Sequence, residues 1–387
     1  MIDFDFEKRC YGCGVCATAC PVDAITMKPN PNGFLIPVIS EEKCVSCNRC
    51  ERVCIELHQN HIEENAYKRK SFLCVNPDTE VLKRSASGGA FGILAEIMIK
   101  HGGYVCGCVF DENMKAVHVV TNKKRDIERM HGSKYVQSDT SECYATIKSL
   151  LRKNVPVLFC GTPCQCAAAQ SLAREEKRED FLYTGAIICH GVPSPKVWNK
   201  WKLYLEGKMK SSMIYANHRV KGSNYNTPES MYIFENGKSL RKATYLEDLY
   251  CYAFSTDIFL RNSCYRCEYK GNHITADIII GDYFDFNHSG DYSEGVSSVI
   301  IATEKGKSMF SRISEIGKRI EISDVIDKNQ ALIRPVALNK HRQSFFEELD
   351  KNDIVTAIKH NVPYGKFILK SFLHKIKLFD KIRNIKR

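Results

Sequence analysis

Between residues 75 and 350, the apolar positions alternate between helical and strand-like spacing. Apolar side chains recur every three or four residues from Phe91 to Ile99, which predicts a helix, and a strand-like run follows at 104–110. The same pattern predicts helices at 141–151 and through Trp198 and Trp201, strands at 155–159, 185–189, 277–282 and 299–302, and a hairpin turn at Asn236-Gly237. Strands that alternate with helices indicate an α/β body.

The C-terminal segment, residues 360–387, has a different pattern. Lysines and a histidine lie on one side of a predicted helix, and the apolar side chains on the other side are Leu369, Phe372, Leu373, Ile376, Phe379 and Ile382. We predict a basic amphipathic helix, which suits an anionic membrane surface or an acidic partner protein. The alternative is that the apolar side packs on the helix's own domain and leaves a solvated cationic side.

Composition and charge limit the class of protein. The chain has 387 residues, 44% of them hydrophobic and 26% charged, which fits a folded protein of two or three domains. Residues 359–387 have nine Lys or Arg against one Asp, so this tail carries +8 of the net charge of +11. No nucleic-acid reader motif accompanies the tail, so we expect no nucleic-acid partner. We found neither a secretion signal nor a long apolar run, and expect a cytoplasmic protein that touches the inner membrane surface at most peripherally.

Nineteen cysteines are the most unusual feature of the composition. Because the number is odd, complete internal disulfide pairing is excluded, and the chain is far longer than a disulfide-stapled scaffold. Two blocks near the N-terminus share the spacing C-x2-C-x2-C-x3-C, at residues 10–20 and 44–54. This run is typical of bacterial ferredoxins, in which the fourth cysteine of each block binds the cluster of the other block.

Residues 1–60 therefore resemble a bacterial-type dicluster ferredoxin that holds two [4Fe–4S] clusters. The exchange of fourth ligands assigns the first cluster to Cys10, Cys13, Cys16 and Cys54, and the second to Cys44, Cys47, Cys50 and Cys20. Gly12 and Gly14 allow the unusual backbone angles of the first loop. Zinc, which also binds C-x2-C pairs, is the alternative, but it does not explain a duplicated run of three close cysteines and a fourth.

A serine- and glycine-rich turn, Ser85-Ala-Ser87-Gly88-Gly89, precedes the first helix of the body. Hydroxyls and unhindered N–H groups at a helix N-terminus can bind a phosphate, although a serine here also serves as an ordinary helix cap.

Four cysteines of the body stand at the ends of predicted elements: Cys164, Cys189, Cys264 and Cys267. A third metal cluster, zinc at the C-x2-C pair 264–267, and buried apolar thiols all agree with the spacing alone. The seven remaining cysteines are expected to be core or incidental thiols.

Five motifs in the body occur in a characteristic order: SASGGAFGILAEIMIKHGGYVCGCVF, HGSKYVQS, VLFCGTPCQ, ICHGVPSPKVW and CYRCEYKGNHITADIIIGDYF. Together they resemble the family of coenzyme F420 hydrogenase/dehydrogenase beta subunits over about residues 75–350. The expected fold class is therefore α+β or α/β. An N-terminal dicluster ferredoxin is fused to an α/β flavoprotein body, and a basic amphipathic helix follows.

The resemblance implies that the body binds FAD and a third [4Fe–4S] cluster. Carried over by motif, Cys164, Cys189, Cys264 and Cys267 would hold the cluster. The same resemblance implies a flavin diphosphate at the SASGG turn, and the implied FAD contacts are Ser85, Ser87, Gly88, Gly89, Ser133, Lys134, Tyr135 and Thr162. No catalytic residue is assigned, and His190 is as well explained by a backbone hydrogen bond as by proton transfer.

The function expected from these features is that of an iron-sulfur flavoprotein oxidoreductase. It would move electrons between the ferredoxin clusters and FAD and act on a small-molecule redox substrate, with an electron-donor protein as a further partner. One alternative is a non-catalytic electron-relay subunit of a larger redox complex, and another is an oxidoreductase that uses coenzyme F420. A structural zinc protein is a third reading, which the paired four-cysteine runs oppose.

Overall fold

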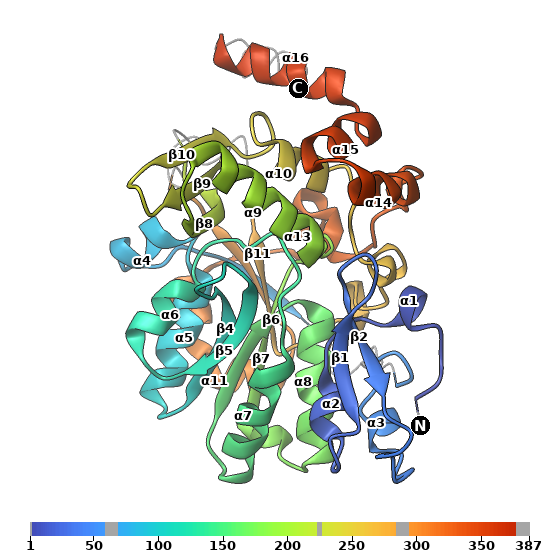
Figure 1. Ribbon diagram of the computed structural model, residues 1–387. Helices are drawn as coiled ribbons and strands as arrows, with labels where there is room; N and C mark the ends of the chain where they lie inside the picture. Colours follow the sequence, from blue (N-terminus) through green and yellow to red (C-terminus); the bar gives the residue numbers. More distant parts are fainter. Residues whose placement is uncertain (1, 59–68, 223–226, 284–293, 377–387) are drawn as a thin grey trace.

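The computed structural model describes residues 2–58, 69–222, 227–283 and 294–376. It contains an N-terminal cysteine-rich domain, a large mixed sheet with helices on both faces, and a smaller antiparallel sheet with its own helices (Figure 1). Within the described part of the chain, no helix is long and apolar enough to cross a membrane.

The N-terminal domain contains short elements around two cysteine loops. Its helices are α1 (Phe6–Arg9), α2 (Val15–Ala19) and α3 (Arg49–Arg52), and its antiparallel strands are β1 (Ile25–Pro29) and β2 (Leu35–Ile39). Gly12 and Gly14 have φ values of +65° and +75°, as their sequence context predicts. Ser46 and Asn48 hold the matching places in the second block, with φ values of +52° and +57°. The two blocks therefore repeat one left-handed backbone pattern, although only the first has glycines.

The large sheet has eight strands in the order β13-β3-β12-β11-β7-β6-β4-β5. The central strands β4, β6, β7 and β11 run parallel, and the outer pairings are antiparallel. The bounds are β3 (Lys70–Cys74), β4 (Tyr104–Phe110), β5 (Ala116–Thr121), β6 (Val157–Gly161), β7 (Leu182–Ile187), β11 (Ile278–Asp282), β12 (Ser297–Ile301) and β13 (Lys318–Ile320).

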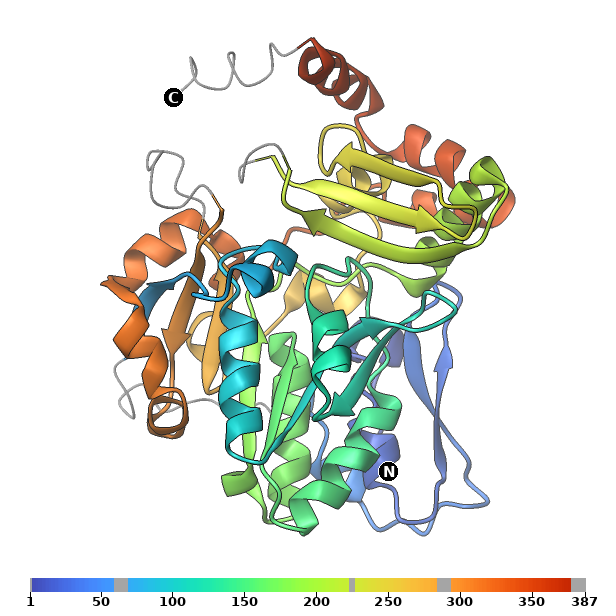
Figure 2. The ribbon, with the colours of Figure 1, turned by 90° about the vertical axis from the view of Figure 1, so that its left-hand side faces the viewer.

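Helices cover both faces of this sheet, because neighbouring strand residues point to opposite sides. Leu158 of β6 packs in the core with α5 (Ala90–Lys100) and α12 (Ser311–Ile316), and the next residue, Phe159, packs with α7 (Ser141–Arg152) and α8 (Pro163–Glu175). Figure 2 shows α5 in front of the sheet. The shorter helices are α4 (Thr79–Arg84), α6 (Lys124–Met130), α11 (Glu304–Met309) and α13 (Ile322–Lys328).

The smaller sheet lies above one end of the large sheet (Figures 1 and 2). Its order is β10-β9-β8, all antiparallel, and the predicted hairpin turn at Asn236-Gly237 joins β9 to β10. The bounds are β8 (Met213–Val220), β9 (Glu229–Phe234), β10 (Ser239–Ala243), α9 (Pro195–Met209), α10 (Leu249–Phe254), α14 (Arg342–Lys351), α15 (Ile354–Asn361) and α16 (Tyr364–Lys375). A separate aromatic core that includes Trp198, Trp201 and Tyr250 holds these elements together.

Most of the predicted elements of the body are present, and two differences are informative. The sequence pattern does not predict strand β3, because the segment up to Ser71 has the composition of a polar connection, and the body is expected only from residue 75. In the structure, Phe72 and Cys74 of β3 are buried in the large sheet. The C-terminal segment forms α16 up to Lys375, and the predicted apolar positions Phe379 and Ile382 lie outside the described residues.

Candidate iron-sulfur and flavin sites

The first ferredoxin set consists of Cys10, Cys13, Cys16 and Cys54, and the fold brings these four thiols together. Burial raises the pKa of Cys16, and the neighbouring thiols of the other three members raise it further. Burial is also the main cause of the raised pKa of Cys54, to about 11. The N–H of Gly12 donates a 3.2 Å hydrogen bond to Cys10 Sγ. Such groups become thiolates only beside a strong positive charge, which a metal cluster supplies.

The second ferredoxin set consists of Cys20, Cys44, Cys47 and Cys50, which line one small pocket of the N-terminal domain. The N–H of Ala24 donates a 3.2 Å hydrogen bond to Cys20 Sγ. Cys47 is exposed, and Val45 beside it is 61% exposed. This set therefore lies at the surface, whereas the first ferredoxin set faces the body.

The body set consists of Cys164, Cys189, Cys264 and Cys267, which line a second pocket. Two members meet because β6 and β7 are neighbouring parallel strands: Cys164 in the first turn of α8, just after β6, and Cys189 in the loop after β7 both lie at the same edge of the sheet. Cys264 lies on a short 3-10 helix, and its Sγ accepts a hydrogen bond of 3.5 Å from the N–H of Val192. Burial raises the pKa of Cys164 to about 11, although its contact with Thr162 Oγ1 lowers it.

The four-cysteine sets fit iron-sulfur cubanes in donor type and number. A [4Fe–4S] cluster takes four thiolates, and backbone N–H groups that donate to the sulfurs tune its potential. Among the described residues, no three His, Cys, Asp or Glu side chains are arranged to hold a single metal ion.

Two tyrosines lie between the first ferredoxin set and the body set. The rings of Tyr11 and Tyr269 meet edge to face with centroids 5.3 Å apart, and both residues line the pocket of the body set. Tyr269 Oη donates a 2.7 Å hydrogen bond to the carbonyl of Ile55, next to Cys54. Burial raises the pKa of Tyr11, as do the neighbouring thiols of Cys267 and Cys164. The buried tyrosine pair therefore separates the first ferredoxin set from the body set.

A buried arginine joins the two domains at the same place. Arg261 is 3% exposed, and its guanidinium donates hydrogen bonds to the carbonyl of Cys10 at 2.7 Å and to the carbonyl of Leu35 at 2.9 Å. A third bond, of 3.0 Å, reaches Gln137 Oε1, and Gln137 Nε2 donates in turn to the carbonyl of Tyr11. The sequence does not indicate this role for Arg261, because all acceptors of its guanidinium are distant in the chain.

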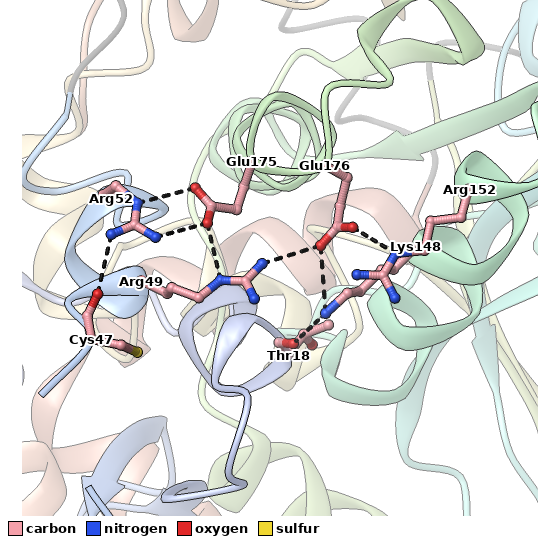
Figure 3. A network of polar contacts seen from close by, with 8 residues as sticks. All are labelled: Thr18, Cys47, Arg49, Arg52, Lys148, Arg152, Glu175 and Glu176. Atoms are coloured by element: carbon pink, nitrogen blue, oxygen red, sulfur yellow. Dashed lines mark hydrogen bonds and ion pairs between the residues drawn. The ribbon is translucent and has the colours of Figure 1, made fainter. Parts of the chain in front are cut away.

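An ionic network fixes the other side of the N-terminal domain (Figure 3). Arg49 of α3 pairs with Glu175 at 3.0 Å and with Glu176 at 3.4 Å. The side chain of Glu176 is 6% exposed, and its carboxylate also pairs with Lys148 and Arg152 of α7. The apolar residues Val15, Ala19 and Val53 pack in the same core cluster as α7 and α8. The N-terminal domain is therefore packed on the body as one unit with it.

The residues implied for FAD fall into three places. The first is beside His131, which both Ser85 Oγ and Lys134 Nζ contact, and Lys134 Nζ also donates to the carbonyls of Arg129 and Met130. Burial lowers the pKa of Lys134 to about 8. The second place is the beginning of β12, where Ser87 Oγ donates a 2.6 Å hydrogen bond to the carbonyl of Val296.

Gly88 is closely packed at this second place: a Cβ there would lie 2.4 Å from the N atom of Ser297. The next residue, Gly89, has a φ of +77° and begins α5. No side chain of the described residues caps this helix. The positive end of its dipole is therefore available to attract a diphosphate. The hydroxyls of Ser85 and Ser87, in contrast, already donate to backbone carbonyls.

The third place lies between the two sheets. Ser133 N–H donates to Asn217 Oδ1, and Tyr135 Oη lies 2.8 Å from Tyr245 Oη. Thr162 stands apart, beside Cys164 of the body set. The structure therefore brings the predicted FAD residues near one end of the large sheet but does not join all eight in one pocket.

The remaining cysteines are mainly core thiols, as predicted. The buried members are Cys74, Cys106, Cys143, Cys160, Cys166 and Cys251, and Cys108 is half-buried. His190, which lines the pocket of the body set, pairs through Nε2 with Asp257 Oδ1 rather than with a backbone group.

Comparison with known families agrees with this arrangement. Residues 9–56 match the family described as 4Fe-4S dicluster domain, which includes both ferredoxin sets. Residues 155–328 match the family described as the C terminus of the coenzyme F420 hydrogenase/dehydrogenase beta subunit, a region that contains all four cysteines of the body set. The chain belongs to the family of coenzyme F420 hydrogenase/dehydrogenase beta subunits. It is an iron-sulfur protein of the oxidoreductase class.

Two individual proteins are also similar to this chain. The F subunit of the F(420)H(2) dehydrogenase of Methanosarcina mazei is 24% identical over 321 residues, which cover 79% of this chain and 82% of that protein. A chain in a structure of the F420-reducing [NiFe] hydrogenase complex from Methanosarcina barkeri is 19% identical, with a TM-score of 0.44. That match covers 70% of this chain and 93% of the other.

Proposed function

We propose that this protein is the electron-carrying subunit of an oxidoreductase complex, and that it moves electrons between ferredoxin-type [4Fe–4S] clusters and FAD. The observation that carries the proposal is the order of the three four-cysteine sets. The second ferredoxin set lies at the surface with Cys47 exposed, the first lies inward, and the body set follows across Tyr11 and Tyr269. A series of closely placed centres suits electron transfer over a distance that no single centre spans.

The residues of the chain would divide the work as follows. The first and second ferredoxin sets would each hold one cluster, and the body set would hold a third. Bound cubanes exchange single electrons, and a flavin exchanges one or two. Such a combination would therefore convert between one-electron and two-electron transfer. Arg261, the Tyr11–Tyr269 pair and the ionic network of Glu176 would keep the sets at fixed separations and exclude water between them.

The FAD diphosphate would lie at the uncapped N-terminus of α5, over Gly88 and Gly89. Lys134 and Tyr135 would approach the flavin from the adjoining loop, and Thr162 would stand on the side of the body set. The small redox substrate would react in the same region, near the end of the large sheet.

The similarity to the F subunit of an F(420)H(2) dehydrogenase supports a place among other subunits, and makes coenzyme F420 one candidate substrate. We further propose that a separate electron-donor protein meets the exposed second ferredoxin set, and that the protein works in the cytoplasm, where thiols stay reduced. The second candidate function is a relay subunit without catalysis of its own, which the exposed Cys47 end also favours.

Anaerobic purification followed by flavin analysis and acceptor screening tests this proposal. We expect about one FAD per chain and a flavin that reoxidises when one small acceptor is added. A protein that binds no flavin contradicts the FAD assignment. A flavin that responds only after a second subunit is added favours the relay function instead.

A further inference from the structure

The C-terminal helix α16 presents an apolar stripe that the described part of the protein does not cover. The exposed fractions are 48% for Ile368, 58% for Leu369, 57% for Phe372 and 44% for Ile376, which directly follows the helix. Ile368, Phe372 and Ile376 are spaced by four residues and Leu369 lies three before Phe372, so the four side chains form one continuous strip.

The helix is attached to the body by its opposite side. Phe367 is 7% exposed and packs against Tyr252, with ring centroids 5.0 Å apart. Lys370 Nζ lies 5.7 Å from the ring centre of the same tyrosine. Figures 1 and 2 both show α16 at the outer edge of the molecule, beyond α15 and the small sheet. The alternative that the apolar side packs on the protein itself is therefore wrong for Leu369, Phe372 and Ile376, although Leu373 is half-buried.

The charged side chains of α16 itself are all positive. The exposed lysines Lys366 and Lys375 lie on the two sides of the stripe, and α16 contains no acidic residue. A second copy of the chain would place lysines against lysines, which is unfavourable. A bilayer surface accepts aliphatic and aromatic side chains of any shape, and anionic lipid headgroups stand at the depth of the flanking lysines.

From this geometry we propose that α16 docks the protein peripherally on an anionic lipid bilayer. Ile368, Leu369, Phe372 and Ile376 enter the boundary between headgroups and acyl chains, and the lysines contact lipid phosphates. Because α16 lies at the edge of the molecule and its stripe faces away from Phe367, a flat surface reaches it without displacing the body. This attachment does not depend on the cofactors or on the proposed electron transfer.

Co-sedimentation of the full chain with lipid vesicles tests the proposal. The protein should sediment with vesicles of phosphatidylcholine and phosphatidylglycerol, release at high salt, and stay in solution with phosphatidylcholine alone. The double variant Leu369→Gln, Phe372→Gln should lose about tenfold in bound fraction, because two of the four buried apolar side chains are removed. Leu338→Gln, at a position that is 65% exposed and distant in sequence, is the matched control and should bind normally.

Three outcomes would overturn the proposal. The first is a chain that stays in solution with anionic vesicles, and the second is a double variant that binds as well as the control. The third is binding to polyglutamate, or a dimer in light scattering that the double variant abolishes, without any binding to vesicles. An unchanged iron-sulfur absorption spectrum shows that each variant is folded.

Discussion

Arg261 donates a 2.7 Å hydrogen bond from Nε to the main-chain carbonyl of Cys10, across a sequence separation of 251 residues. The bond links the loop of the first ferredoxin set to the segment that carries Cys264 and Cys267. Electron transfer between two centres depends steeply on their separation, so a buried contact that fixes this separation is as relevant to function as the ligands themselves.

Replacing Arg261 should weaken the junction between the domains. Arg261→Gln removes the buried guanidinium from its three acceptors, and we expect a loss of roughly 3 kcal/mol in stability. The measurement is the thermal midpoint of the anaerobically purified protein. Arg334→Gln, at an exposed site, is the control and should leave the midpoint unchanged. Equal thermal midpoints for the two variants would show that the Arg261 contacts contribute little to the stability of the protein.

Gly12 should not tolerate a side chain. A Cβ at Gly12 would lie 2.5 Å from Arg261 Nη1, and the backbone has a φ of +65°. Gly237 has a similar φ of +78°, but a Cβ there would have nothing within 4 Å, so Gly237→Ala carries the backbone strain alone, about 1 kcal/mol. We expect Gly12→Ala to destabilise the protein clearly more than Gly237→Ala in parallel thermal scans. If the two variants lower the thermal midpoint by the same amount, the contact of the Gly12 position with Arg261 is not tight.

Glu176 should hold the outer side of the N-terminal domain. Its carboxylate pairs with Arg49, Lys148 and Arg152, so Glu176→Gln leaves three cations without their shared anion and should cost about 1–3 kcal/mol. We expect faster hydrogen exchange in residues 44–56. Glu304→Gln, whose side chain is 66% exposed, is the control. Exchange as slow as in the control would contradict this role for the network.

Stability should decline as the pH falls from about 6.5 towards 4. Burial lowers the pKa of His118 to about 4, and its ring lies 3.0 Å from the carbonyl of Cys160 through Nε2. Between the two pKa values the unfolded chain binds a proton that the folded chain does not, so acid favours unfolding by up to about 3 kcal/mol. Unfolding measured between pH 7 and pH 5 should show this slope. His118→Gln, which keeps a donor for the carbonyl, should reduce the slope without abolishing it, because burial also lowers the pKa of His131 to about 4 and of His218 to about 3. An unchanged slope would assign the effect to those two groups.

The sequence predicts the ferredoxin sites better than the body site, for a physical reason. The ferredoxin ligands repeat within short loops, so their spacing alone limits the metal they can bind. Cys164, Cys189, Cys264 and Cys267 meet only because β6 and β7 are parallel neighbours and a 3-10 helix folds back onto their ends. Spacing alone therefore leaves open a third cluster, zinc at the C-x2-C pair 264–267 and buried apolar thiols, and the family resemblance favours the cluster.

Contacts between distant segments were beyond reach from one sequence. Tyr11 stands between two ligands and Tyr269 just after Cys267, yet nothing local indicates that their rings meet. The left-handed backbone at Ser46 is a different case: the residue type does not indicate a positive φ, and only the place of Ser46 opposite Gly12 in the repeated block does.

Iron and acid-labile sulfide analysis of cysteine variants tests the central claim most directly. We expect about twelve irons per chain in the anaerobically purified protein, from three cubanes. Cys264→Ser should lower this number to about eight, because it removes one ligand of the body set. Cys251→Ser, a buried thiol outside the three sets, should keep all twelve. About eight irons in the unmodified protein, unchanged by Cys264→Ser, would contradict the third cluster and with it the proposed path from ferredoxin to body.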